Sequence, residues 1–271
     1  AKEIVDNTFN LGSASLQGID FHLKTYKGEA DDNLSIFVEK FQTDTPKDSL
    51  SDLFVLNSAN IYLDNFNFRL VNENKINKNQ FLVKNGGGSL SDFNISGPNV
   101  RANLRGLYFV DERGIEITNL TTDFSYSKTA MLFLKTVLQT KTSHINANIG
   151  FSYAREDLKF FNDKVAIKAN FRESSVSLLD LNKLYDEFGL DDVLHVTANL
   201  TGTLNDFSVD GFDLFSDHGL LMKGDLKFKN AVTTESGFSF NADLINSRLN
   251  YGHLTSILPT ILGEKLPSTL K

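Results

Sequence analysis

The stretch HINANIGFSY, residues 144–153, decides the fold class predicted for this chain. It alternates strictly, because one side of an extended backbone would carry only Asn, Gly and Ser while the other carries Ile145, Ala147, Ile149, Phe151 and Tyr153. Successive side chains of a β-strand point to opposite faces, so this alternation is typical of a strand with one buried and one wetter face. The stretch therefore predicts a sheet that is apolar on one face.

The same period-two pattern recurs and predicts that most of the chain is strand. Residues 60–70 and residues 114–126 each switch their apolar side chains from one alternation to the other. Such a switch predicts a β-bulge, near Asp64 and Asn65 in the first segment, and bulges of this kind curve a sheet. The count is roughly twelve or more strands, mostly in antiparallel meanders. Further strands are predicted over 164–171, 195–202, 224–230 and 237–244.

Two segments have helical spacing instead. Residues 177–190 carry an apolar stripe, begin with Ser177 and Asp180 in the arrangement of a capping box, and meet Gly189 near their end. Residues 253–270 carry a similar stripe, which Pro259 should kink or divide. We therefore expect two short amphipathic helices. Polar clusters predict loops over 28–33, 42–52, 72–79, 85–88 and 153–163.

A ten-residue phrase occurs twice, as GSLSDFNISG over 88–97 and as GTLNDFSVDG over 202–211. Each copy predicts a polar corner followed by a short strand, closed by a glycine that lets the chain bend again. The phrase is either a repeated supersecondary unit, as in elongated arrays, or a common hairpin solution that has been reused by chance.

The composition argues against several classes of function. The net charge is −7 and the basic residues are scattered, so no nucleic-acid interface is predicted. The chain has no cysteine and its five histidines are isolated, so we expect no metal and no cofactor. Ser125 and Lys128 match an S-x-x-K motif, but in a strand these two positions point to opposite faces. We therefore expect that the protein is not an enzyme.

Membrane-spanning helices are not expected either. The longest apolar run is residues 130–134, whereas a bilayer requires about 20 residues. The chain opens at AKEIV with neither an initiator Met nor a signal pattern. We expect it to be a piece of a longer polypeptide, with any anchor outside it.

Several segments, taken in order, resemble the periplasmic region of the TamB family, which belongs with the AsmA-like proteins, in its Bacteroidota-type form. These segments are LQGIDFHLKTYKGEADDNLSIFVEKF (16–41), LNSANIYLDNFNFRLVNEN (56–74), GLYFVDERGIEITNLTTDFSYSK (106–128), the repeated G-S/T-L-x-D-F phrase and LPTILGEKLPSTL (258–270).

The resemblance implies a mainly β fold: a long, curved, largely antiparallel sheet folded into an open apolar groove, often called a β-taco. It implies one elongated segment over 1–271, with sub-repeats near 1–120 and 121–271. It also implies a periplasmic location, an inner-membrane anchor absent from this chain, and an outer-membrane partner of the Omp85 family that binds regions outside it. The function implied is phospholipid transport between the two membranes in support of outer-membrane biogenesis.

The strand pattern supports a groove in one respect. A dozen one-faced strands and two short helices leave a broad apolar face uncovered, unless the sheet closes as a barrel or sandwich. An open apolar trough would hold acyl chains, since each buried methylene is worth roughly 0.8 kcal/mol. The alternatives are an ordinary dry core, and a scaffold that assembles outer-membrane proteins by β-augmentation. The candidate groove residues are Phe93, Ile95, Ile145, Ile149, Phe151, Val165, Ile167, Phe171, Val196, Leu200, Phe207, Val209, Leu226, Phe228, Phe238 and Phe240.

Overall fold

The structure is a computed structural model of the 271-residue chain. It describes residues 4–5, 8–39, 54–76, 78–232, 237–248 and 250–259. Strands account for 63% and helices for 12%, which confirms the mainly β class. The chain divides into two compact units, Ala1–Lys128 and Thr129–Lys271.

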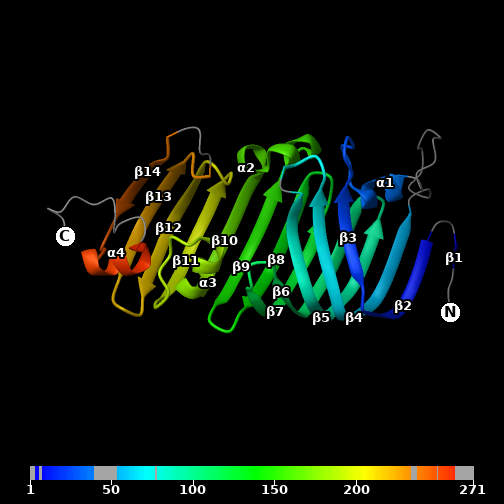
Figure 1. The fold of residues 1–271 in the computed structure, drawn as a ribbon, viewed down its shortest axis with the longest axis horizontal. Helices are drawn as coiled ribbons and strands as arrows, with labels where there is room; N and C mark the ends of the chain where they lie inside the picture. The colour runs from blue at the N-terminus through cyan, green and yellow to red at the C-terminus, as the bar shows by residue number, and fades with distance from the viewer. Residues whose placement is uncertain are drawn as a thin grey trace. The chain divides into compact units, whose positions relative to one another are not determined.

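The strands of the first unit form one sheet in the order β1-β2-β4-β5-β6-β7. Its long strand β4 pairs in parallel with β2 along one half and with β3 along the other, so these two short strands lie end to end beside it. The other pairings are antiparallel. The elements are β1 (Ile4–Val5), β2 (Thr8–Gln17), β3 (Asp20–Thr25), α1 (Asn33–Glu39), β4 (Val55–Asn72), β5 (Asn79–Ser96), β6 (Asn99–Asp111) and β7 (Glu116–Tyr126) (Figure 1).

The second unit is an antiparallel meander in which each strand from β8 to β14 pairs with the next. Short helices stand at the two ends of its strands, with α2 at one end and α3 and α4 at the other (Figure 1). The elements are β8 (Ala130–Gln139), β9 (His144–Ser152), the 3-10 helix η2 (Arg155–Phe160), α2 (Phe161–Lys164), β10 (Ala166–Ser177), α3 (Leu178–Leu184), β11 (Val193–Gly202), β12 (Phe207–Ser216), β13 (Leu221–Lys229), β14 (Ser239–Leu244) and α4 (Tyr251–Ile257).

Bulges in β6, β8, β10 and β12 share one arrangement. At each bulge one residue adopts a positive φ, and its amide donates to a side-chain oxygen on the following strand. The positive φ and the extra residue bend the strand locally and raise its twist. The four pairs are Gly106 with Thr121 Oγ1 at 3.2 Å, Lys135 with Asn148 Oδ1 at 2.7 Å, Glu173 with Thr197 Oγ1 at 3.3 Å, and Gly211 with Asp225 Oδ1 at 2.7 Å.

The predicted phase switches are confirmed. In β4 the register with β5 shifts between Leu63 and Phe66, and Asn65 has a φ of 50°. In residues 114–126 the shift falls between Ile117 and Leu120. The bulges in β8, β10 and β12 were not predicted, although each leaves the same mark in the sequence, an inward residue followed by the next inward residue three positions later.

The prediction of a loop over residues 85–88 is wrong, because these glycines lie inside β5. Aromatic rings from the neighbouring strands occupy the space that side chains at Gly86 and Gly87 would fill. A Cβ on Gly86 would collide with the Phe66 ring, and a Cβ on Gly87 would collide with the Tyr108 ring. Glycine therefore marks a close approach of side chains here, not a turn.

The two copies of the repeated phrase adopt different structures. In the second copy the polar corner is confirmed, since a turn links Thr203 and Asp206 (Thr203 N to Asp206 O, 2.8 Å) before β12 begins at Phe207. The closing glycine is wrong, because Gly211 lies inside β12, which continues to Ser216. In the first copy the polar residues continue inside β5, where Asp92 has a φ of 51° within the strand. The phrase is therefore not one repeated structural unit.

The described residues contain four short α-helices and one 3-10 helix, where two helices were predicted. Helix α1 was not predicted, and the predicted loop over 153–163 contains η2 and the start of α2. Helix α4 ends at Ile257, before Pro259, and the rest of the helix predicted over 253–270 lies outside the described residues, as does most of the loop predicted over 42–52. Helix α3 begins as predicted, with the Ser177 hydroxyl accepting from the Leu179 amide at 3.2 Å. The capping box is wrong, because Asp180 bonds elsewhere.

We expect Asn148→Ala to lower the free energy of unfolding by about 1 kcal/mol, because the Lys135 amide at the β8 bulge loses its acceptor. Urea unfolding monitored by circular dichroism measures the change. The matched control is Asn146→Ala, two positions earlier on the same face of β9, which should leave stability nearly unchanged. Equal effects of the two substitutions would contradict a role for the capped bulge.

Candidate functional site

One face of the second unit's sheet carries two rows of apolar side chains, which together we call the apolar strip. Residues paired directly across antiparallel strands point to the same face, so the register defines each row. One row consists of Met131, Phe151, Ile167, Gly202, Phe207, Phe228 and Phe240, and the other consists of Phe133, Ile149, Ala169, Leu200, Val209, Leu226 and Ala242.

Aromatic contacts run along the strip. The rings of Phe207 and Phe228 stack with centroids 4.5 Å apart, and Phe240 lies 5.0 Å from Phe228. Farther along, Phe133 meets the edge of Phe151 at 6.4 Å. Seven strands at about 4.8 Å spacing make the strip about 29 Å long across the strands.

The structure brings nine of the sixteen candidate residues into the strip. Ile145, Phe171 and Val196 lie on the same face in neighbouring rows, with Phe171 paired to Ala147 and Val196 paired to Leu214. Val165 and Phe238 directly precede β10 and β14. The candidates in the strip are Ile149, Phe151, Ile167, Leu200, Phe207, Val209, Leu226, Phe228 and Phe240.

The remaining two candidates belong to the first unit. Phe93 and Ile95 lie in β5, opposite Ser58 and Leu56 of β4. Both are half-buried in that unit's own sheet. They are therefore not part of the apolar strip.

The candidate residues do not form a sealed core. Only Val165 and Ile167 are buried, and twelve others are half-buried. At the β14 edge, Phe238 is 62% exposed and Phe240 is 49% exposed. A closed core would bury most of these side chains almost completely, so this face keeps part of its apolar surface accessible to solvent.

Helices cover the strip's two margins. At one margin α3 and α4 close over a buried cluster, against which Val196, Leu214 and Met222 pack. At the other, Phe161 of α2 lies 5.8 Å from Phe151, and the Asn205 amide donates to the Asn162 carbonyl at 2.9 Å. The two rows lie between these margins. The buried cluster consists of Leu178, Leu194, Leu220 and Ile257.

The opposite face of the same strands is polar. Asn170 and Asn199 lie opposite each other, and their side chains are joined by a hydrogen bond of 2.6 Å. Lys168 and Thr201 pair beside them and are exposed. The sheet of the second unit is therefore amphipathic, as the alternation in residues 144–153 predicts.

Sequence reasoning missed several residues of the strip. Met131 and Phe133 belong to the apolar run over 130–134, for which no strand was predicted, although the alternation continues on either side of the bulge at Lys135. Ala169 and Ala242 lie in segments predicted as strands, 164–171 and 237–244, but neither is among the candidate residues, and alanine carries little apolar surface. Phe161, which lies at the margin of the strip, was also missed, because it falls in the segment predicted to be a loop. The inward residues of β8 are spaced two, three and two positions apart, as Met131, Phe133, Thr136 and Leu138. A search for this spacing would have found Met131 and Phe133.

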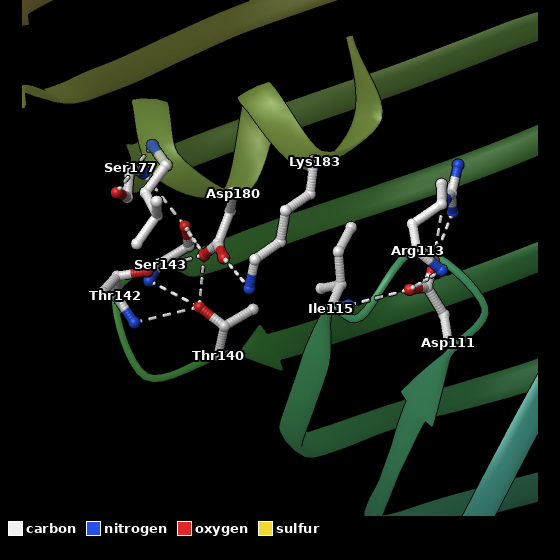
Figure 2. A network of polar contacts seen from close by, with 10 residues as sticks. Asp111, Arg113, Ile115, Thr140, Thr142, Ser143, Ser177, Asp180 and Lys183 are labelled. Carbon is white, nitrogen blue, oxygen red and sulfur yellow. Dashed lines mark hydrogen bonds and ion pairs between the residues drawn. The ribbon is translucent and has the colours of Figure 1, made fainter. Parts of the chain in front are cut away.

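Asp180 of α3 lies at the centre of a network of polar contacts (Figure 2). It is buried, and its Oδ2 accepts hydrogen bonds from the hydroxyls of Thr140 at 2.6 Å, Ser143 at 2.7 Å and Thr142 at 2.8 Å. Lys183 Nζ lies 3.8 Å from its Oδ1. Burial raises the pKa of Asp180, but the three hydroxyls and Lys183 outweigh it, so the pKa lies below its ordinary value. The carboxylate joins the β8–β9 turn to α3.

In the first unit, Asp111 closes the β6–β7 turn in a similar way (Figure 2). Its Oδ1 accepts from the amides of Ile115 at 2.9 Å and Arg113 at 3.0 Å, while its Oδ2 lies 2.7 Å from Arg113 Nη2. Every group in this network is used in holding the turn. We therefore read both carboxylate networks as structural.

Two findings concern other kinds of site. Among the described residues, no cluster of three or more His, Asp or Glu side chains has an arrangement that could hold a metal ion. Within the same part of the chain, no helix is both long and apolar enough to span a bilayer.

Comparisons with protein-family models, curated proteins and solved structures find no match to this chain.

We expect Asp180→Asn to lower the free energy of unfolding by about 2 kcal/mol at pH 7, because hydrogen bonds to an ionised carboxylate are the stronger kind. The folded pKa lies below the unfolded one, so this contribution is complete above about pH 4 and is lost as the pH falls through the folded pKa. Urea unfolding across this range should show the difference from the parent protein shrinking. A difference that stays constant with pH would contradict the assignment, and Asp186→Asn is the control.

Proposed function

We propose that the apolar strip binds lipid acyl chains, and that the protein is a periplasmic segment of a TamB- or AsmA-like bridge that carries phospholipid between the inner and outer membranes. The observation that carries the proposal is the continuous apolar row from Phe133 in β8 to Ala242 in β14, together with the incomplete burial of the strip. The membrane context comes from the sequence resemblance, as does the expected Omp85-family partner.

The dimensions of the strip suit acyl chains. A bilayer's hydrocarbon core is about 30 Å thick, so a single chain spans about 15 Å, roughly half the length of the strip. Each methylene that leaves water contributes roughly 0.8 kcal/mol, so tails can be held without any specific polar site. Binding by area alone would let a chain slide along the rows. The helices at the two margins would limit its sideways movement.

The chain contains no tryptophan, which provides a direct test. A single Trp at Phe240, in the strip, should be quenched strongly by phospholipids with brominated acyl chains. A Trp at Asn241, the next residue on the opposite face, should not. Both positions are exposed, so neither substitution should unfold the protein. Equal quenching at the two positions, or none at Phe240, would rule out lipid binding on this face.

A second candidate function is β-augmentation of unfolded outer-membrane strands at the β14 edge. All six residues of β14 are exposed, and in the described part of the chain only β13 pairs with it. The free edge of β3, by contrast, is covered, because the Asn33 side chain accepts from the Lys24 amide and donates to the His22 carbonyl, both at 2.9 Å. An apolar edge strand without such protection is a template for pairing.

Photo-crosslinking tests this alternative. A crosslinking residue at Asn241 should capture an unfolded outer-membrane β-barrel polypeptide, whereas one at His22, beside the covered edge, should capture much less. Similar yields at both positions would contradict recognition by the edge.

A further inference from the structure

A cleft of about 700 Å³ lies beside α3 and α4, away from the strip's two rows. It is lined by Asn182 of α3, by Asp186, by the loop from Phe188 to Asp192, by His218, and by Thr255, Ser256 and Pro259. The Gly189 amide donates to the Ile257 carbonyl at 2.9 Å, and a Cβ on Gly189 would collide with the Ser256 carbonyl. The two walls of the cleft are therefore joined through backbone, at a position that requires glycine.

The carboxylates around the cleft fall into two kinds. Asp192 is buried and committed to the fold, since it accepts from the Val193 amide at 2.8 Å and lies 3.1 Å from His218 Nδ1. Asp186 and Asp191 are exposed, and among the described residues no side chain forms an ion pair or hydrogen bond with either carboxylate. The cleft therefore presents two negative charges that the fold does not neutralise.

Apolar side chains adjoin these charges. Leu190 is 55% exposed and lines the cleft together with Phe188 and Pro259, and nearby Tyr185 is 60% exposed. Large exposed apolar side chains beside unneutralised carboxylates are typical of a recognition surface, since the former supply anchoring area and the latter select the charge of the partner.

We infer that this cleft is a docking site for a basic amphipathic segment of a partner polypeptide, with an apolar side chain seated against Phe188 and Leu190 and basic side chains facing Asp186 and Asp191. The charge of the cleft is what selects this occupant. An acidic or neutral peptide would leave both carboxylates unpaired. The inference does not depend on lipid binding, because none of the lining residues belongs to the apolar strip.

The test is fluorescence anisotropy with a labelled helical peptide made of leucine and lysine, added to the full chain. The double variant Asp186→Asn, Asp191→Asn should bind about fivefold more weakly, since each exposed ion pair contributes a modest amount. The matched control removes two exposed carboxylates elsewhere, Glu112→Gln with Glu156→Gln, and should bind like the parent protein. Amide NMR shifts should change at Asn182, Leu190 and Thr255.

Several results would overturn the inference. One is no saturable binding, and another is equal loss of affinity in both double variants, which would indicate attraction to the net charge of −7 alone. If a leucine–glutamate peptide binds equally well, the carboxylates do not select a basic partner. If a peptide of lysine alone binds as tightly, the apolar side chains of the cleft do not anchor the partner. Shifts in the apolar strip in place of the cleft would assign the peptide to the lipid face. Quenching by brominated lipid should be the same in the Asp186→Asn, Asp191→Asn background, so the two proposals can fail separately.

Discussion

The structure depends on a bulge amide that is satisfied by a side chain from the next strand. At Lys135, Glu173 and Gly211 the inserted residue turns its N–H out of the ladder, and Asn148, Thr197 or Asp225 accepts it. For the two residues that are not glycine, a positive φ costs about 1–2 kcal/mol. The side-chain acceptor offsets part of that cost, and leaving the amide without a partner would add to it. The bend is therefore built into the strand pairing itself.

The bulges also keep the sheet one-sided. An extra residue would ordinarily send every later side chain to the opposite face, but here the residues change phase at the same point. Phe133 and Thr136 of β8 face the same side, as do Val209 and Phe212 of β12, because their partners Ile149 and Ala147, or Leu226 and Gly224, alternate without a break. Bending and amphipathicity are thus compatible, and the apolar rows stay continuous.

The small helices serve different ends of this arrangement. Helix α3 is held to the β8–β9 turn by its own Asp180, which accepts hydrogen bonds from three hydroxyls of that turn. Together with α4 it covers one margin of the apolar face. The same two helices, with the loop after α3, also line the acidic cleft. None of the residues that line the cleft belongs to the apolar strip, so the lipid and peptide proposals involve separate side chains.

The sequence by itself determined the β class, the one-faced strands, the bulge in β4 and the N-cap of α3, because each depends on neighbours within a few residues. Nine of the sixteen candidates that the sequence offered as alternating apolar positions also lie in the strip. Only the tertiary structure decided which of those positions share a row, since register joins residues that are distant in the chain, as Ile167 is opposite Phe151. The roles of Asp180 and Gly86 could not be predicted for the same reason. The hydroxyls that bind Asp180 come from the β8–β9 turn, and the Phe66 ring that lies against Gly86 comes from β4. Local pattern sets the face on which a side chain lies, and long-range pairing sets what it meets there.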